Sequence, residues 1–287
     1  MSAPRARSRL NQAAAGKSYP DSAFEVTAEA IEAYARATND LNERYLAGGN
    51  SVASPVWPVV PAFGFFMAAV ADPELGAEPR RLLHLREEHV LRAPIRAGDL
   101  LHCSGVLSEV DADAGTFSVT VVERNQEVVE VAEVRATMLV RGAGRPARIE
   151  PAELPAAASY EERVRIDPDQ TRRYAEASGD DNPIHLDREA ARRAGLRGII
   201  VHGMCTMAMA TAGAVNGPAE GDPTRVERVA AYFARPVVPG QELLTRFWPQ
   251  HQEGAVAAFG FASFDERGAL VLTNAQALVR SASSTGS

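Results

Sequence analysis

The chain repeats part of its own sequence. Residues 26–46 and 166–186 align without a gap at an offset of 140 positions. The identical pairs are Tyr34/Tyr174, Ala35/Ala175, Ala37/Ala177, Asp40/Asp180, Asn42/Asn182 and Leu46/Leu186. Three later matches follow in the same order at offsets of 139 to 142: Phe63-Gly64 with His202-Gly203, residues 93–98 with 235–240, and residues 136–141 with 275–280. Matches in one register over so much of the chain predict a duplicated domain.

Each half shows the same coarse order of elements. A helix comes first, with Thr27 or Asp167 placed to cap it and Pro168 at the favoured first helical position. A loop, an uncharged apolar helix and several β-rich runs follow. In the second half, a short helix between Asp187 and Gly195 precedes the apolar one. This order predicts an α+β fold in which an antiparallel sheet wraps around an apolar helix, twice in tandem.

The domain boundaries are expected to follow the repeat. The predicted parts are a disordered tail (1–17), an amino-terminal domain (18–141), a linker rich in Pro, Ala and Gly (142–159) and a carboxy-terminal domain (160–281). The predicted strands are residues 100–108, 116–123 and 128–140 in the first half and 226–234, 242–250, 256–264 and 270–279 in the second.

Composition excludes several classes of protein. The 287 residues include 30 basic and 37 acidic side chains, and the net charge of −7 argues against a nucleic-acid-binding protein. Two cysteines, Cys103 and Cys205, allow one disulfide at most and indicate a cytoplasmic protein. Neither uncharged stretch, 47–71 or 198–219, holds the run of about 18–20 apolar residues that a membrane helix needs. No secretory signal is visible.

The two copies differ where chemistry is expected. The second copy carries Asp180 and His185 five residues apart on a loop bent by Gly and Pro, whereas Tyr45 replaces the histidine in the first copy. A carboxylate and an imidazole at that spacing can converge on one water, and Asn182 can hold the carboxylate or a substrate carbonyl. The alternative interpretation of the same loop is ordinary turn residues with a structural histidine.

His202 and Gly203 stand at the start of the second apolar helix. The N–H of Gly203 is one of the unpaired donors of a helix N-terminus, where the helix dipole favours negative charge. A glycine there also lets a ligand approach the backbone closely, which suits an oxyanion hole for a thioester. The alternative is a helix start that needs a small residue for packing.

An apolar loop with three prolines (55, 58 and 61) leads into the first apolar helix. Trp57 and Phe63, with neighbouring valines, either line a channel for a hydrocarbon chain or pack the core. Because each buried methylene contributes about 0.8 kcal/mol, such a channel would bind a longer hydrocarbon chain more tightly, which for an acyl substrate means a preference for medium or long chains.

These motifs together resemble a known family. SGDDNPIHLD (178–187), followed by GIIVHGMCT (198–206), is similar to the hydratase 2 motif of MaoC-like dehydratases, which include (R)-specific trans-2-enoyl-CoA hydratases of the hot-dog fold. ARPVVPGQEL (234–243) resembles a strand and turn of that family. LHLREEHVLRAPIRAGD (83–99) resembles the matching part of its degenerate amino-terminal hot-dog. The likeness covers nearly the whole chain after the tail.

The resemblance implies tandem hot-dog domains of which one has lost the catalytic histidine. Asp180 and His185 would hold the catalytic water, Asn182 would support them, Gly203 N–H would bind the thioester oxygen, and His202 would contact the substrate. The implied protein is a cytoplasmic hydro-lyase of fatty acyl metabolism. It would interconvert trans-2-enoyl-CoA and (R)-3-hydroxyacyl-CoA, with acyl-CoA as its partner and a homodimer as one assembly.

Two other functions stay open at this point. One is a dehydratase of carrier-bound or branched 3-hydroxyacyl thioesters. The other is a non-catalytic subunit that binds acyl thioesters, which the intact Asp180 and His185 pair argues against. The resemblance implies no metal and no cofactor, which agrees with the lack of a Cys/His cluster with zinc spacing and of a dinucleotide glycine motif after a strand.

Overall fold

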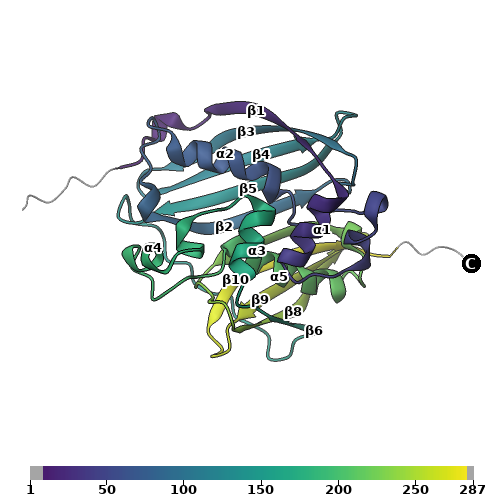
Figure 1. Ribbon diagram of the computed structural model, residues 1–287. Helices are drawn as coiled ribbons and strands as arrows, with labels where there is room; N and C mark the ends of the chain where they lie inside the picture. Colours follow the sequence, from purple (N-terminus) through teal and green to yellow (C-terminus); the bar gives the residue numbers. More distant parts are fainter. Residues whose placement is uncertain (1–8, 283–287) are drawn as a thin grey trace, which may run out of the picture.

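The computed structural model describes residues 9–282, and its ten strands form one antiparallel sheet (Figure 1). The first five strands are β1 (Ser18–Glu25), β2 (Leu82–Leu91), β3 (Leu100–Asp111), β4 (Thr116–Arg124) and β5 (Glu130–Val140). The other five are β6 (Tyr160–Arg165), β7 (Val226–Phe233), β8 (Glu242–Glu253), β9 (Val256–Phe264) and β10 (Leu270–Arg280). The order is β1-β3-β4-β5-β2-β7-β10-β9-β8-β6, so both halves run from edge to junction in the same sequence of elements.

Two apolar helices lie on one face of this sheet. α2 (Val59–Ala71) crosses β1, β3 and β4, and α5 (Gly203–Asn216) packs on β6, β7 and β8 (Figure 1). All side chains from Met204 to Val215 are buried, as expected for a helix that is apolar on every side. Each half is therefore an antiparallel sheet wrapped around one apolar helix, which confirms the predicted fold class.

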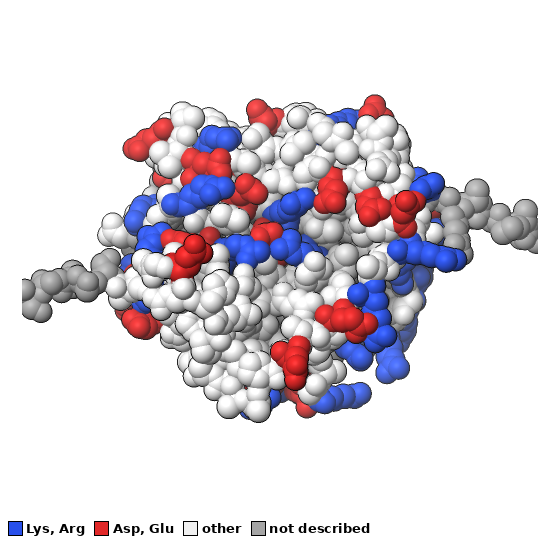
Figure 2. All heavy atoms as spheres, turned by 180° about the vertical axis from the view of Figure 1, so that it is seen from behind, with Lys and Arg blue, Asp and Glu red and all other residues white. Residues whose placement is uncertain are grey.

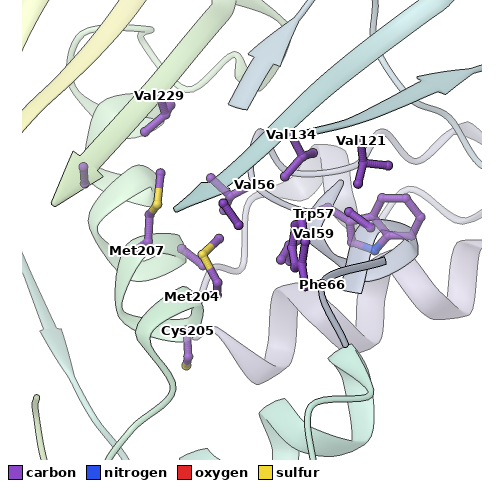
Figure 3. Packing of buried hydrophobic residues seen from close by; sticks show 14 of the residues in the cluster. Val56, Trp57, Val59, Phe66, Val121, Val134, Met204, Cys205, Met207 and Val229 are labelled. Carbon is purple, nitrogen blue, oxygen red and sulfur yellow. The ribbon is translucent and has the colours of Figure 1, made fainter. Parts of the chain in front are cut away.

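The two halves share one core where β2 pairs with β7. Figure 3 shows Val56 and Val59 of the amino-terminal half beside Met204 and Met207 of α5, with Val229 of β7 above them. The buried apolar side chains of the described residues form one continuous cluster that runs through both halves. The halves therefore stabilise each other through a common interior.

The first helices of the two copies also meet. α1 (Ala28–Ala37) and α3 (Gln170–Ser178) lie side by side, and the rings of Tyr34 and Tyr174 are 5.6 Å apart between centroids (Figure 1). Asn39, which follows α1 with a left-handed φ of 56°, donates hydrogen bonds across this seam to the second copy. The repeated segments thus pack against each other as well as against the sheet.

The start of α3 differs from the prediction. The helix begins two residues later than expected, with Asp169 at its N-cap, so Pro168 is not its first residue. Asp167 instead accepts hydrogen bonds from Arg173 (2.6 Å) and Asn39 (3.2 Å). Its carboxylate is engaged in the contact between the halves, which a pattern of neighbouring residues does not reveal.

Two other predicted helix caps are confirmed. The hydroxyl of Thr27 accepts a hydrogen bond from the N–H of Ala30 at the start of α1. The carboxylate of Asp187 accepts one from the N–H of Ala190 at the start of α4 (Arg188–Arg193). Both therefore satisfy N–H groups that a helix start leaves unpaired.

The sequence analysis misses β1, β2 and β6. β1 and β6 are edge strands, with one buried side chain in β1 and none in β6, so they carry little apolar alternation. β2 lies at the centre, but charged residues stand on both of its faces and hide the period of two. The other seven strands, in which apolar and polar residues alternate, are predicted correctly, with ends shifted by a few residues.

Part of the predicted tail is folded. Leu10 is buried, and the N–H of Asn11 donates to the backbone carbonyl of Leu75, so residues 9–17 pack against the domain because they carry an apolar anchor. Residues 1–8 of that tail lie outside the described residues. Residues 142–159 form neither helix nor strand, and the exact domain boundaries stay a prediction.

Within residues 9–282, no helix combines the length and apolar character needed to cross a membrane. Figure 2 shows the face of the sheet opposite the helices, where acidic and basic side chains are interspersed. On β2 and β7, Arg86 and Arg228 both pair with Glu88. This face shows no basic stripe of the kind that nucleic acid requires, although the absence of a nucleic-acid partner stays a prediction.

The packing of α5 predicts the effect of a single methyl group. Gly213→Ala should lower the free energy of unfolding by about 1–3 kcal/mol, because overpacking forces neighbours to move. The added carbon would lie 2.7 Å from a ring carbon of Phe247 and 2.8 Å from Cβ of Glu162. In α2, Gly64→Ala is the matched control: its methyl meets nothing within 4 Å, and it should gain about 0.5–1 kcal/mol from helix propensity. Urea unfolding followed by circular dichroism measures both, and effects of the same sign would contradict this account.

Candidate active site

The loop after α3 carries the carboxylate and the imidazole singled out in the sequence. Gly179 ends α3 with a left-handed φ of 78° and turns the chain toward Asp180. A single 3-10 turn, Pro183–His185, then buries the side chain of His185. Asn39, the residue that the repeat aligns with Gly179, is also left-handed, so both copies make this turn.

The structure brings Asp180 and His185 together and adds His202 to them. One carboxylate oxygen of Asp180 and one ring nitrogen from each histidine all lie within 4.8 Å of one another. The rings of His185 and His202 are stacked, with centroids 3.9 Å apart. The three side chains come from two segments of the carboxy-terminal half, the loop after α3 and the residue before α5.

Backbone carbonyls set the tautomers of both histidines. Nδ1–H of His185 donates to the carbonyl of Ile200 (2.9 Å), which leaves Nε2 of His185 free to accept a proton. Nε2–H of His202 donates to the backbone carbonyl of Asp180 (3.0 Å), and its Nδ1 has no partner. His202, predicted as a substrate contact, is almost fully buried and here holds the loop that carries Asp180.

The environment moves the pKa values of the pair toward each other. Burial raises the pKa of Asp180. The charge of His185 and a hydrogen bond from the N–H of Asn182 to the carboxylate (3.2 Å) act to lower it. Burial lowers the pKa of His185, whereas the charge of Asp180 acts to raise it. Burial and the charge of His185 lower the pKa of His202 to about 3, so His202 is neutral at ordinary pH. Two groups with converging pKa values can exchange a proton at small cost in free energy.

Gly203 begins α5, and no hydrogen bond among the described residues uses its N–H. The positive end of the helix dipole lies at the same place. A Cβ on Gly203 would lie 3.2 Å from a ring carbon of Phe233, so the glycine also permits a close approach by that ring. Both interpretations of this glycine, oxyanion donor and packing, are thus compatible with its surroundings.

Asn182 stabilises the loop that carries the pair. Its side-chain oxygen accepts a hydrogen bond from the N–H of Ile184 (3.3 Å) and so caps the 3-10 turn, while its own N–H supports Asp180. The side chain is exposed at the surface of the loop. A catalytic role for Asn182 stays a prediction.

The apolar loop before α2 contributes to the core. Trp57 has no exposed surface and packs edge-to-face on Phe24, with centroids 5.7 Å apart, among the side chains shown in Figure 3. Phe63 is partly buried against the same cluster. Trp57 therefore offers no surface to a ligand in this conformation, and the substrate contacts predicted for both residues stay predictions, as does the preference for longer acyl chains.

The amino-terminal copy keeps the carboxylate without the rest of the site. Burial raises the pKa of Asp40 to about 6, and Tyr45 is fully buried beside it. The amide of Asn42 donates to the backbone carbonyl of Gly221 (2.9 Å). Gly64, which the repeat aligns with Gly203, lies inside α2 and not at its start, because α2 begins at Val59.

Three potential metal donors meet at Asp180, His185 and His202, with their ligand atoms within 4.8 Å of one another. A metal ion there would have to use Nε2 of His185 and Nδ1 of His202, because the other ring nitrogen of each histidine is bonded to a backbone carbonyl. The absence of a metal and of a cofactor stays a prediction.

A hollow of about 120 Å³ lies elsewhere, between the loop before α2 and the segment that leads into β7. Ser54, Pro58 and Thr224 are among its lining residues, whereas Asp180 and His185 are not. We place the candidate site by its proton-transfer groups, because a hollow without such groups offers no comparable chemistry.

Sequence reasoning misses two residues beside the site. Phe233, at the end of β7, faces Gly203, and His84 of β2 packs on Phe233 with centroids 4.5 Å apart. The signal for His84 was present in the charged run of residues 84–89, which is unusual for a central strand.

Two family models match the chain: a MaoC-like domain over residues 152–257 and a FAS1-like dehydratase domain region over residues 13–137. The 3-hydroxyacyl-thioester dehydratase Y of Mycobacterium tuberculosis is 33% identical over 210 residues, which cover 68% of this chain and 70% of that protein. The peroxisomal enoyl-CoA hydratase 2 of Arabidopsis thaliana is 39% identical over 84 residues, 29% of this chain. That match spans about a quarter of the plant protein (27%).

Solved structures share the fold. One described as a MaoC-like dehydratase gives a TM-score of 0.81 at 21% identity and covers 94% of this chain and 99% of that chain. A Mycobacterium tuberculosis protein described as a double hot-dog fold gives 0.58 at 12% identity and covers 93% and 96%. These structures show the fold alone, which is two tandem hot-dog domains. Identity that extends along more than two thirds of both chains decides the family: the protein belongs to the MaoC-like dehydratase family.

Proposed function

We propose that the protein adds water reversibly to trans-2-enoyl-CoA and forms (R)-3-hydroxyacyl-CoA. The observation that carries this proposal is the grouping of Asp180 with His185 near the start of α5, where the N–H of Gly203 is unpaired. The group combines two proton-transfer side chains with a donor for a developing oxyanion. The names of an enoyl-CoA hydratase and a 3-hydroxyacyl-thioester dehydratase among the relatives support it.

In the proposed reaction, Asp180 and Nε2 of His185 hold a water over C3 of the enoyl thioester. One of them takes a proton as the water oxygen bonds to C3, and a proton is delivered to C2 on the same face. The charge that develops on the thioester oxygen is met by the N–H of Gly203 at the positive end of α5. His202 is neutral and holds the backbone of Asp180, so it fixes the position of Asp180 relative to His185.

Dehydration of carrier-bound or branched 3-hydroxyacyl thioesters is the second candidate. The name of the mycobacterial relative and the match of residues 13–137 to a dehydratase region favour it. The deciding experiment follows the enoyl-thioester absorbance with crotonyl-CoA, a longer enoyl-CoA and the same acyl groups on a carrier protein, with chiral analysis of the product. No loss of absorbance with any of them would overturn hydration of straight-chain enoyl-CoA and its carrier-bound counterpart.

A cytoplasmic location and a homodimer stay predictions. The Arabidopsis thaliana relative is named as peroxisomal, so the family is not confined to one compartment.

Substitution of either member of the pair should abolish most of the activity. We expect His185→Ala and Asp180→Asn each to lower kcat by about 10²–10⁴-fold, the usual contribution of a general acid or base. Steady-state hydration kinetics give the effect, and circular dichroism checks the fold. His251→Ala, an exposed histidine of β8, is the matched control and should keep full activity. A folded His185→Ala protein with nearly unchanged kcat would refute the assignment.

The activity should fall as the pH is lowered. The pair must start with an ionised Asp180, and burial raises the pKa of that carboxyl, so the loss should begin well above the value of about 3.9 typical of an exposed aspartate. His202 adds no loss until about pH 3, where its lowered pKa lies. The measurement is kcat/KM for hydration as a function of pH. A profile that stays flat down to about pH 4 would contradict an essential Asp180 carboxylate.

The amino-terminal copy should contribute no second active site. Asp40→Asn and Tyr45→Phe are expected to leave kcat within about threefold, far less than the loss of an acid–base group. Burial raises the pKa of the Tyr45 phenol well above its ordinary value, so this residue cannot act as a base near neutral pH. Titration with a tight substrate analogue should give one site per chain, and two equivalent sites would show that this expectation is wrong.

A further inference from the structure

The pairing of β2 with β7 relates the two copies by a local two-fold axis. The turns after these strands carry the left-handed glycines Gly98 and Gly240, which set an offset of 142 residues between the copies. At that offset Glu88 of β2 is equivalent to Ala230 of β7, and these two residues lie directly opposite each other in the ladder. Antiparallel strands that meet at equivalent residues form a two-fold contact, so each place in one copy has a counterpart in the other.

Two backbone hydrogen bonds locate the counterpart of the start of α5. The N–H of Val201, just before α5, donates to the carbonyl of Val237 (2.8 Å). In the amino-terminal copy, the N–H of Ala53 donates to the carbonyl of Ile95 (2.9 Å). Val237 and Ile95 are equivalent at the offset of 142, so Val201 and Ala53 occupy equivalent places.

The next two residues of each segment are therefore equivalent as well. Ser54 stands in the place of His202, and Pro55 stands in the place of Gly203. In the carboxy-terminal copy α4 lies between the site loop and this point, whereas the amino-terminal copy has a shorter loop there, so an ungapped alignment does not reveal the match. Both Ser54 and Pro55 line the hollow of about 120 Å³ described above.

Two strand residues of the hollow follow the same symmetry. Leu91, at the end of β2, and Val226, at the start of β7, line it. At the offset of 142 they correspond to Phe233 and His84, whose rings pack on each other beside the start of α5. The hollow thus occupies, in the amino-terminal copy, the place that the candidate active site occupies in the carboxy-terminal copy.

The hollow has mostly apolar walls and one buried polar group without a partner. Ser54 is 8% exposed, and its hydroxyl makes no hydrogen bond with any of the described residues. The other hydroxyl in the wall, that of Thr224, donates to the carboxylate of Asp222 (2.7 Å). Because a buried hydroxyl without a partner costs free energy, Ser54 marks a place for a hydrogen-bonding atom of a ligand.

The charged side chains at the hollow are already paired. Arg92 binds Glu130 (2.6 Å) and Arg280 binds Glu227 (2.7 Å). Both arginines are about half exposed, so they stand at the open side of the hollow. These pairs leave little net charge for an anion, which favours a neutral ligand.

The volume limits the size of that ligand. One buried water needs about 10–15 Å³ of cavity volume, so a hollow of about 120 Å³ accepts about ten non-hydrogen atoms. A short acyl chain with its thioester group and the first atoms of the thiol arm has this size. Its carbonyl oxygen is an acceptor for the hydroxyl of Ser54.

We propose that the hollow is a second, non-catalytic site for neutral short-chain acyl thioesters, held by a hydrogen bond from the hydroxyl of Ser54 to the thioester carbonyl. The class of ligand rests on the function proposed above, because the hollow has the place at which the other copy is proposed to hold the same group. Asp40 and Tyr45 do not line the hollow, and Pro55 has no N–H to offer an oxyanion. A thioester there is therefore bound but not hydrated.

This site should be weaker than the active site. It has no counterpart of the unpaired N–H of Gly203 and none of the proton-transfer pair. A tight substrate analogue at stoichiometric concentration therefore still fills one site per chain, and the hollow fills only at higher concentration.

Carbon-13 NMR of protein labelled at isoleucine δ1 methyls follows both places in one titration. Ile95 lines the hollow, and the carbonyl of Ile200 binds His185 in the candidate active site. The probe is S-butyryl-N-acetylcysteamine, a saturated thioester that cannot be hydrated, and Ile95→Val and Ile200→Val assign the signals. Both signals should move, that of Ile95 at the higher concentration. A signal of Ile95 that does not move up to the solubility limit of the probe would overturn the inference.

Substitutions in the wall test the contact itself. Ser54→Ala removes one hydrogen bond, so it should weaken the response of Ile95 by about three- to tenfold and leave that of Ile200 unchanged. Ser108→Ala, on β3 and outside the hollow, is the matched control and should change neither. Ala93→Phe, which fills the hollow from its half-buried wall, should abolish the response of Ile95 alone. Wild-type affinity at Ile95 in a folded Ser54→Ala protein would contradict the proposed hydrogen bond.

Butyryl-CoA and a butyryl carrier protein distinguish the two sources of such a thioester. The source that moves the signal of Ile95 at the lower concentration is the one that the site serves. Movement with the small probe but with neither complete thioester would overturn the assignment of the ligand.

The inference and the proposed function can fail separately. If no enoyl thioester is hydrated but Ile95 responds to the probe and loses that response in Ala93→Phe, the proposed function fails and the second site holds. If hydration proceeds but Ile95 does not respond, the second site fails and the proposed function holds.

Discussion

The pairing of β2 with β7 is the interaction on which the rest of the molecule depends. It runs from Arg86 opposite Tyr232 to Val90 opposite Arg228 and makes one sheet of two halves. The two apolar helices share a core above that seam. Because β2 and β7 pair with each other, neither is an exposed edge strand. The same pairing brings β2 beside Phe233 and thereby beside the start of α5. The candidate site is therefore a product of the junction, although its proton-transfer groups all come from one copy.

Duplication explains why the two copies have diverged so far in their chemistry. Each keeps the left-handed turn after its first helix, the carboxylate that follows and the asparagine two residues on. In the amino-terminal copy these polar groups serve the fold: the amide of Asn42 donates to the backbone carbonyl of Gly221, and Tyr45 is buried beside Asp40. α2 also begins before its glycine, so the N–H at that position is inside a helix and not at its positive end.

The charged run of β2, residues 84–89, shows most clearly which strands the alternation of apolar and polar residues fails to predict. Alternation of apolar and polar residues finds strands that bury one face in hydrocarbon. Glu87 and His89 are polar but buried, and Leu85 breaks the alternation with a bulge, so this strand at the centre of the sheet resembles a polar loop in sequence. Asp167 fails as a helix cap for a related reason, because its carboxylate is bound to Arg173 and to Asn39 of the other copy.

The sequence by itself determined the duplication, the wrapping of a sheet around an apolar helix, and the loop that carries Asp180 and His185. These depend on spacing and periodicity, which are local properties of the chain. Only the tertiary structure decided that His202 stacks on His185, that carbonyls set both tautomers, that Trp57 is buried in the core and that His84 approaches the site. Each of these depends on which distant residues share a low-dielectric interior, because burial and contact set the pKa values and hydrogen bonds of a side chain.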